Sequence, residues 1–122
     1  MTIQALKFIS DTLIDIGINY EFGRWSSNPV PAVFWVGEYT ETESVNEDGL
    51  QETTIILTGT TKEKWISLEK DKDKIKNIFP KTAILNNSGV AVFYRNAIII
   101  PVENMDMKRM QINLQIKEWS VN

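Results

Sequence analysis

The clearest hydrophobic pattern in the chain is a strict alternation near its C-terminal end. Apolar side chains occupy every second position from Met110 to Ile116, and polar side chains occupy the positions between, from Arg109 to Lys117. A period of two matches a β-strand, in which successive side chains point to opposite faces of the sheet. We therefore expect a strand over 107–119, with its apolar face on the core and its polar face on water or a partner.

A spacing of three or four residues predicts two helices. The first follows Thr2, a good N-cap, and ends at Gly17, because glycine accepts the left-handed conformation that terminates a helix. The second begins at a capping box formed by Thr60 and Glu63, with a start that could lie several residues later, and runs to Phe79. The apolar stripe predicted for the first helix consists of Ile3, Leu6, Ile9, Leu13 and Ile16.

Four further segments are rich in β-branched and aromatic residues, as strands are: 32–39, 51–58, 90–94 and 97–102. The first two flank the turn sequence Asn46-Glu47-Asp48-Gly49, which predicts a β-hairpin. Its far half, around 40–52, is too polar for burial and should project from the body. The last two segments form either one kinked strand or two short ones.

These elements predict one α+β domain over 1–122. The expected sheet is antiparallel with four to five strands, two helices pack on one face, and the order is α-β-β-α-β-β. A length of 122 residues with 43% hydrophobic residues suits a single core. The apolar clusters are shorter than the roughly 20 residues of a membrane helix, and the N-terminal residues lack a secretory pattern. We expect a soluble intracellular protein.

The residue types present offer little for catalysis. The chain has no histidine and no cysteine, so the usual acid/base groups, thiols and zinc ligands are missing. No glycine-rich phosphate loop, nucleophile elbow or metal-spaced cluster occurs. Asp11 and Asp15 lie one turn apart on the first helix, where a solvated surface explains them better than a catalytic pair. We expect no enzyme activity, no cofactor and no metal.

Four tryptophans raise the question of a stacking surface for bases or sugars. Trp35 and Trp65 fall inside apolar strand and helix patterns, so we assign them to the core. Trp25 and Trp119 stand at the ends of elements, where an interface is plausible. Lysines are not interleaved with these rings, as single-strand binding would require.

The charges are segregated along the chain. The net charge of −3 argues against a general nucleic-acid binder. No basic residue occurs between Arg24 and Lys62, whereas lysines outnumber carboxylates from Lys62 to Lys81. The acidic residues of the first stretch are Glu38, Glu41, Glu43, Glu47, Asp48 and Glu52. The lysines predicted on the second helix include Lys70, Lys72, Lys74 and Lys76.

Several segments together resemble one protein family. They are the amphipathic first helix, Pro31-Ala32-Val33-Phe34-Trp35-Val36-Gly37-Glu38-Tyr39, Ile56-Leu57-Thr58-Gly59, Gly89-Val90-Ala91-Val92-Phe93-Tyr94, Pro101-Val102 and Leu114-Gln115-Ile116-Lys117-Glu118-Trp119. The pattern resembles the tail-terminator or tail-completion proteins of long-tailed phages, especially those in prophages of Gram-positive bacteria. The resemblance implies an α+β subunit that forms a hexameric ring, caps the tail tube and docks with the head connector.

The same resemblance implies partners and a location. The partners would be further copies of the chain, the tail tube protein and the head connector protein, with DNA passing through the ring without specific binding and no membrane involved. Assembly would occur in the host cytoplasm, and the final place would be the tail–head junction of the virion. Isolated copies could stay monomeric, since no large apolar patch is obvious. A head-completion or connector protein of the same virion, or a small host protein-binding module, are the alternatives.

A ring requires two different patches that meet between neighbouring subunits. The acidic hairpin and the lysine-rich helix are candidates, because opposite charges select register. The hairpin would reach a neighbour or line the lumen, and the alternative is a solvated hairpin without a partner. The polar side of the last strand is a second candidate surface, formed by Gln111, Asn113, Gln115 and Lys117.

Overall fold

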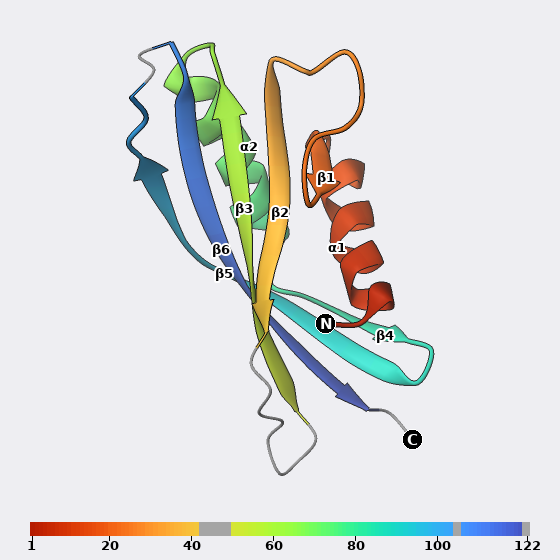
Figure 1. The fold of residues 1–122 in the computed structure, drawn as a ribbon. Coiled ribbons are helices and arrows are strands. Elements are labelled where there is room, and N and C mark those ends of the chain that lie inside the picture. The colour runs from red at the N-terminus through yellow and green to blue at the C-terminus, as the bar shows by residue number, and fades with distance from the viewer. Residues whose placement is uncertain (42–49, 104–105, 121–122) are drawn as a thin grey trace.

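A computed structural model describes residues 1–41, 50–103 and 106–120, and these residues form two helices and six strands. In chain order the elements are α1 (Ile3–Asp15), β1 (Tyr20–Phe22), β2 (Val33–Glu41), β3 (Gln51–Thr61), α2 (Trp65–Ile78), β4 (Lys81–Leu85), β5 (Ser88–Ile100) and β6 (Lys108–Ser120). The strands form one sheet in the order β1-β2-β3-β6-β5-β4. The sheet is strongly twisted and curls into a half-barrel (Figure 1).

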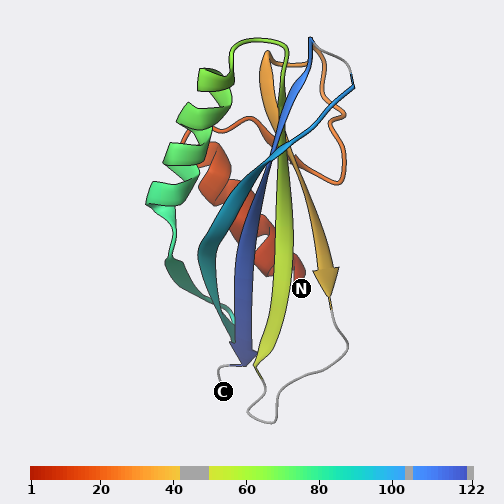
Figure 2. The same ribbon diagram turned by 90° about the vertical axis from the view of Figure 1, so that its left-hand side faces the viewer.

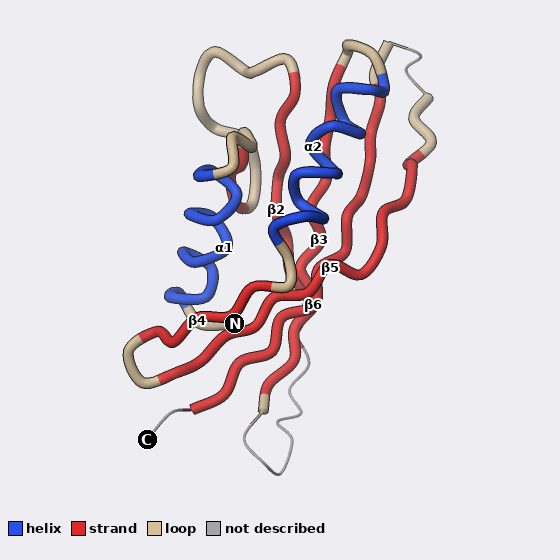
Figure 3. Tube along the Cα trace, turned by 180° about the vertical axis from the view of Figure 1, so that it is seen from behind, coloured by secondary structure: helices blue, strands red, loops and turns tan. Residues whose placement is uncertain are grey.

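Both helices lie on one face of this sheet, and the other face carries no helix (Figures 2 and 3). Helix α1 packs beside β1, whereas α2 packs across β3, β6 and β5. The core fills the space between the two layers, because each helix and each strand turns its apolar side inward. Its fully buried members include Ile9, Leu13, Leu68, Ile75, Trp35, Ile55, Leu57, Val90, Val92, Ile112, Leu114 and Ile116.

The predicted fold class is wrong in strand number, element order and strand direction. Among the described residues the order is α-β-β-β-α-β-β-β, and the sheet is mixed because β1 pairs parallel with β2. The sequence did not predict β1 or β4. They contain three and five residues, and such short strands owe their pairing to the neighbouring strand more than to their own residue pattern. Tyr20 of β1 lies opposite Trp35 of β2.

Strands β2 and β3 form the predicted antiparallel pair. Val33 lies opposite Thr61, and Glu41 lies opposite Thr53. Residues 42–49, which contain the predicted turn and most of the predicted projection, lie outside the described residues. Within the pair, the Trp35 indole covers Gly59, where an added Cβ would come within 2.6 Å of the ring. Glycine at this position therefore allows the largest core side chain to lie flat on the sheet.

The predicted capping box of α2 is wrong, because β3 continues through the residues that should have formed it. Thr60 lies opposite Arg109 of β6, and Thr61 lies opposite Lys108. Thr61 Oγ1 donates to the carbonyl of Ala32 at 2.9 Å and accepts from the Glu63 amide at 3.0 Å. The strand pairing of Thr60 and Thr61 with β6 therefore outweighs their local preference for a helix N-terminus. Helix α2 begins at Trp65 without a side-chain cap.

The predicted caps of α1 are confirmed. Thr2 Oγ1 accepts a hydrogen bond of 3.1 Å from the Ala5 amide, and Gly17 has a φ of +88° after the helix end. The predicted stripe is wrong at Ile3, which is 82% exposed. Ala5 is buried in its place, because the buried face is rotated toward Ala5, Ile9, Thr12 and Leu13.

The C-terminal strands match the sequence pattern closely. The alternation in β6 is confirmed, since its apolar positions from Met110 to Ile116 are buried. The single kinked strand is also confirmed as β5. Tyr94 lies opposite Leu114, Asn96 lies opposite Asn113, and Arg95 between them has no opposite residue. This β-bulge bends the strand near its middle.

Candidate functional site

The sheet face without helices is the first candidate surface. Cross-strand rows on this helix-free face combine β2, β3, β6 and β5. The rows are Phe34-Thr60-Arg109-Ile100, Val36-Thr58-Gln111-Ile98, Glu38-Ile56-Asn113-Asn96 and Thr40-Thr54-Gln115-Phe93. These rows mix apolar and polar side chains and include the charged residues Glu38 and Arg109, a mixture that protein interfaces share with ordinary surface.

Side-chain hydrogen bonds connect the amides of this face. Gln111 Nε2 donates to Asn113 Oδ1 at 3.1 Å, and Asn113 Nδ2 donates to Asn96 Oδ1 at 2.7 Å. Gln115 Nε2 donates to Glu52 Oε2 at 3.1 Å. These hydrogen bonds favour particular rotamers along the predicted row from Gln111 to Gln115, and such ordering lowers the entropy that a side chain loses on binding.

The structure places two of the predicted acidic residues beside this row. Glu52 lies opposite Lys117, with 3.8 Å between Oε1 and Nζ, and the same Nζ lies 5.6 Å from the centroid of the Phe93 ring. Glu38 is exposed in the row of Asn113, and Glu41 is the last residue of β2. The remaining acidic candidates, Glu43, Glu47 and Asp48, lie outside the described residues. Glu52 is thus paired within the subunit, although an ion pair this exposed adds little stability.

The predicted lysines of α2 lie on the helix layer, on the opposite side of the sheet. Lys72 Nζ contacts Glu69 Oε2 at 2.6 Å, and this hydrogen bond raises the pKa of Lys72. Lys76 Nζ lies 5.8 Å from the centroid of the Tyr94 ring, whereas Lys70 and Lys74 are exposed. Among the described residues, the predicted acidic groups on β2 and β3 are therefore not brought together with the predicted lysines of α2.

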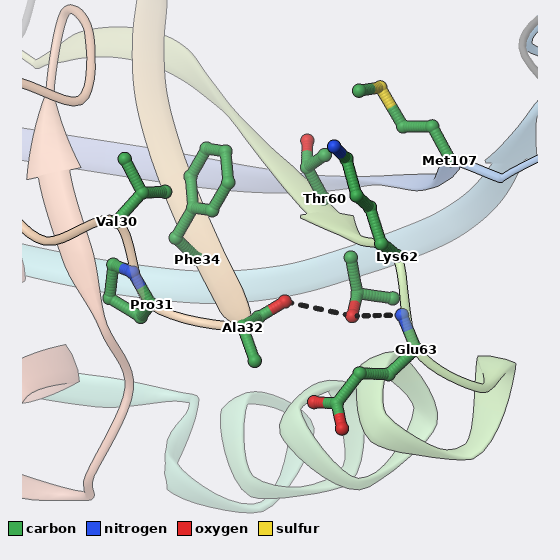
Figure 4. A pocket seen from close by; sticks show the side chains of 9 residues that line it. Val30, Pro31, Ala32, Phe34, Thr60, Lys62, Glu63 and Met107 are labelled. Carbon is green, nitrogen blue, oxygen red and sulfur yellow. Dashed lines mark hydrogen bonds between the residues drawn. The ribbon is translucent and has the colours of Figure 1, made fainter.

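Sequence reasoning missed an apolar pocket where β2 begins and β3 ends (Figure 4). Its volume is about 310 Å³. The lining residues are Val30, Pro31, Ala32, Phe34, Thr60, Thr61, Lys62, Glu63 and Met107. They come from three separate parts of the chain, so only the tertiary structure assembles them. The hydrogen bond from Thr61 to the Ala32 carbonyl joins two of those parts.

A basic rim adjoins this pocket. We use the term for Lys62, Lys64 and Lys108, which line a neighbouring hollow together with Glu63, Ile66 and Ser67. The two hollows share Lys62 and Glu63. Within the described parts of the chain, none of the three lysines forms an ion pair. The rim therefore offers positive charge that the other described residues do not pair in an ion pair.

The loop before β2 supports one wall of the pocket. The Trp25 ring packs on Phe34 with 5.5 Å between centroids, and its Nε1 donates to the Ser27 carbonyl at 2.8 Å. The Glu21 carboxylate accepts from the Ser26 hydroxyl at 2.6 Å and from the Ser26 and Ser27 amides at 3.2 and 3.1 Å. These hydrogen bonds lower the pKa of Glu21, with the Ser26 hydroxyl as the largest cause.

The tryptophan predictions have mixed outcomes. Trp35 is fully buried, as predicted, and its Nε1 donates to Asp71 Oδ2 at 2.9 Å. The prediction for Trp65 is wrong, because this residue begins α2 and is 37% exposed. Trp119 lies over Gly89 on the helix-free face. Trp25 and Trp119 thus flank the pocket and the helix-free face, where their interface role stays a prediction.

Two further observations concern chemistry and membranes. The described residues contain no group of three or more carboxylates placed to hold a metal ion. Neither helix within 1–41, 50–103 and 106–120 has the length and apolar character needed to cross a membrane.

Comparison with known proteins gives a match in fold. No protein family model matches the chain, and no curated protein matches its sequence. A chain from a solved structure described as the virion of a native gene transfer agent (GTA) particle aligns with a TM-score of 0.63 and 9% sequence identity. The alignment covers 88% of this chain and 84% of that chain. The two chains therefore share a fold along most of their lengths.

Proposed function

We propose that the protein is a structural component of a virion, and specifically the tail terminator that closes the tail tube as a ring and joins it to the head connector. One observation carries the proposal: the fold is shared almost end to end with a chain of a gene transfer agent virion. The sequence resemblance to tail terminators supports it independently, because that resemblance uses residue patterns and the fold match has only 9% identity.

The helix-free face suits a protein that acts by docking. It presents apolar side chains such as Ile98 beside amides that are already oriented by hydrogen bonds. Preformed donors and acceptors reduce the ordering cost of association. The role proposed here needs no catalysis, since the protein would act through shape and charge.

The proposed partners follow from the ring. Further copies of the chain would meet through two different patches, the tail tube protein would bind one side, and the head connector would bind the other. Assembly in the host cytoplasm and a final place at the tail–head junction belong to the same proposal. The hexameric number and the passage of DNA through the ring come from the family resemblance.

Electron microscopy of tails made without this protein tests the proposal. A phage or prophage that encodes the chain is induced with the gene deleted, and the tail tubes are measured. Loss of a terminator should give tubes of irregular length without heads, and a plasmid copy of the gene should restore uniform tubes. Tubes of normal, uniform length in the deletion strain would refute the terminator role.

A head-completion or connector role is the second candidate, because the matching structure is described as a whole virion. The two roles differ in what the purified protein binds. A terminator should bind the end of isolated tail tubes, whereas a head-completion protein should bind DNA-filled heads that lack tails. Binding to neither would favour a protein-binding module outside the virion.

A further inference from the structure

The apolar pocket and the basic rim form one composite site. The pocket is lined largely by apolar groups, including Val30, Phe34 and Met107, and has room for a bulky apolar side chain. The rim adds three lysines beside it, against the single carboxylate of Glu63. The chemistry of this site therefore fits an apolar anchor that is flanked by several carboxylates.

We infer that the site binds the acidic segment 42–50 of a second copy of the chain. This segment has the sequence Thr-Glu-Ser-Val-Asn-Glu-Asp-Gly-Leu, with three carboxylates, no basic residue and an apolar Val45 among them. Opposite charges on the two surfaces would steer the copies together and fix their register. In the inferred contact Val45 would fill the pocket, and Glu43 and Glu47 would supply the carboxylates for the rim.

The contact must form between copies. Segment 42–50 connects the end of β2 to the start of β3, whereas the pocket lies at the other ends of these strands, near Val33 and Thr61. The eleven residues of β3 span about 36 Å at roughly 3.3 Å per residue. A nine-residue segment fixed at both ends extends no more than about 15 Å. It cannot reach the pocket of its own subunit.

The inferred contact is heterologous, because a segment on one copy meets a different site on the next. It deepens the proposed function by naming two surfaces through which the ring would close. It rests on the proposed function in one respect, because a ring requires copies of the chain to bind one another. It also differs from the contact predicted from sequence. That prediction paired the acidic hairpin with the lysines of α2, whereas the inferred contact pairs it with Lys62, Lys64 and Lys108 of the rim.

Cysteine cross-linking gives the first test, because the natural chain has no cysteine. One preparation carries Met107→Cys in the pocket wall and the other carries Val45→Cys. Mixed at low salt under mild oxidation, they should form a disulfide-linked heterodimer well above the level of either homodimer. Ile84→Cys, on exposed β4, replaces Met107→Cys in the control and should give only background cross-linking. A heterodimer yield equal to this control overturns the inference.

A charge swap gives the second test. The rim variant carries Lys62→Glu, Lys64→Glu and Lys108→Glu, and the segment variant carries Glu43→Lys and Glu47→Lys. Each variant alone should self-associate about tenfold more weakly than the natural chain in analytical ultracentrifugation. An equal mixture should regain association, because each reversed surface then meets a surface of opposite sign. Circular dichroism confirms that each variant is folded.

The two tests separate this inference from the proposed function. Unchanged self-association of both variants, or no gain on mixing, overturns the inferred contact whatever the tail phenotype. If deletion of the gene still gives irregular tubes, the terminator role stands and the ring closes through other surfaces. If cross-linking succeeds and the tubes are normal, the chain self-associates in a different role.

Discussion

Thr2 and Glu118, which are 116 residues apart in the chain, form a hydrogen bond of 2.8 Å from the Thr2 hydroxyl to Glu118 Oε1. The Thr2 amide donates to the same oxygen at 3.2 Å. Glu118 is only 5% exposed, and it lies near the end of β6 next to the first turn of α1. One threonine thus caps a helix and binds one oxygen of a buried carboxylate, whereas Glu118 Oε2 is buried with no hydrogen-bond partner among the described residues.

Replacing Thr2 should therefore cost more stability than an ordinary cap. Thr2→Ala removes the hydroxyl that accepts from Ala5 and donates to Glu118. We expect the free energy of unfolding to fall by about 2 kcal/mol. Urea denaturation measures the change, and Thr2→Ser, which keeps the hydroxyl, should lose less than half as much. Equal losses for both variants would show that the hydroxyl is not responsible.

Gly59 should not tolerate a methyl group. Gly59→Ala places a Cβ within 2.6 Å of the buried Trp35 ring, so the indole must move and its hydrogen bond to Asp71 is strained. We expect a loss of about 2 kcal/mol in the free energy of unfolding, together with a changed tryptophan fluorescence spectrum. Thr58→Ala, at the neighbouring position on the helix-free face, is the control and should change neither quantity appreciably.

Burial of Tyr20 predicts a loss of stability at high pH. Burial raises the pKa of Tyr20 from 10.0 to about 12. The unfolded chain releases this proton first, so the stabilising contribution is complete below pH 10 and is lost as the pH rises from 10 to about 12. The loss should approach about 3 kcal/mol at the upper end. Tyr20→Phe should remove this part of the pH dependence, and unfolding curves of both proteins between pH 9 and 12 would measure it.

The Glu21 loop predicts an effect of opposite sign in acid. The Ser26 hydroxyl lowers the pKa of Glu21 below its ordinary 4.5. The resulting stabilisation is present above pH 4.5 and disappears as the pH falls through the lowered pKa of the folded state. Ser26→Ala should raise the pKa of Glu21 toward 4.5 in a carboxyl titration followed by NMR. Ser67→Ala on α2 is the control, and an equal shift there would exclude the Ser26 contact as the cause.

The helix-free face should be needed for assembly and not for folding. Ile98 on this face and Ile14 on α1 are 51% and 53% exposed, so arginine at either position should change the free energy of unfolding by less than about 0.5 kcal/mol. Ile98→Arg should reduce the yield of complete virions at least about tenfold, since it places a charge where docking is proposed. Ile14→Arg should give normal yields. Equal yields from both variants would remove this face from the assembly model.

The long elements with a regular hydrophobic pattern were predictable from sequence, because the side chains that the pattern marks as apolar are the ones that the fold buries. The alternation in β6 and the caps of α1 are examples, since each feature is encoded within a few neighbouring residues. The start of α2 was not predictable, because Thr60 and Glu63 fit a capping box equally well until β6 pairs with Thr60. The three residues of β1 are too few for a local pattern, and the strand is defined by its parallel pairing with Trp35, Val36 and Gly37 of β2.

The candidate site was predictable only in part. The polar row of β6 could be found because one strand contains all of it, whereas its links to Asn96 and Glu52 depend on the pairing of three strands. The apolar pocket left no continuous signal, because Phe34 and Met107 are far apart in the sequence. The sequence predicted the basic patch on α2, where Lys72 pairs with Glu69, and it gave no sign that Lys62, Lys64 and Lys108 lie together beside the pocket.

The bulge in β5 affects whether unassembled subunits aggregate. Strand β4 covers β5 only as far as Val92, so among the described residues the backbone beyond that point forms an open sheet edge next to Ile98 and Ile99. Such an edge invites strand addition and fibre growth. The unpaired Arg95 breaks the regular ladder there and puts a charge on it. A pool of unassembled subunits would thereby be protected from aggregation until the correct neighbours are made.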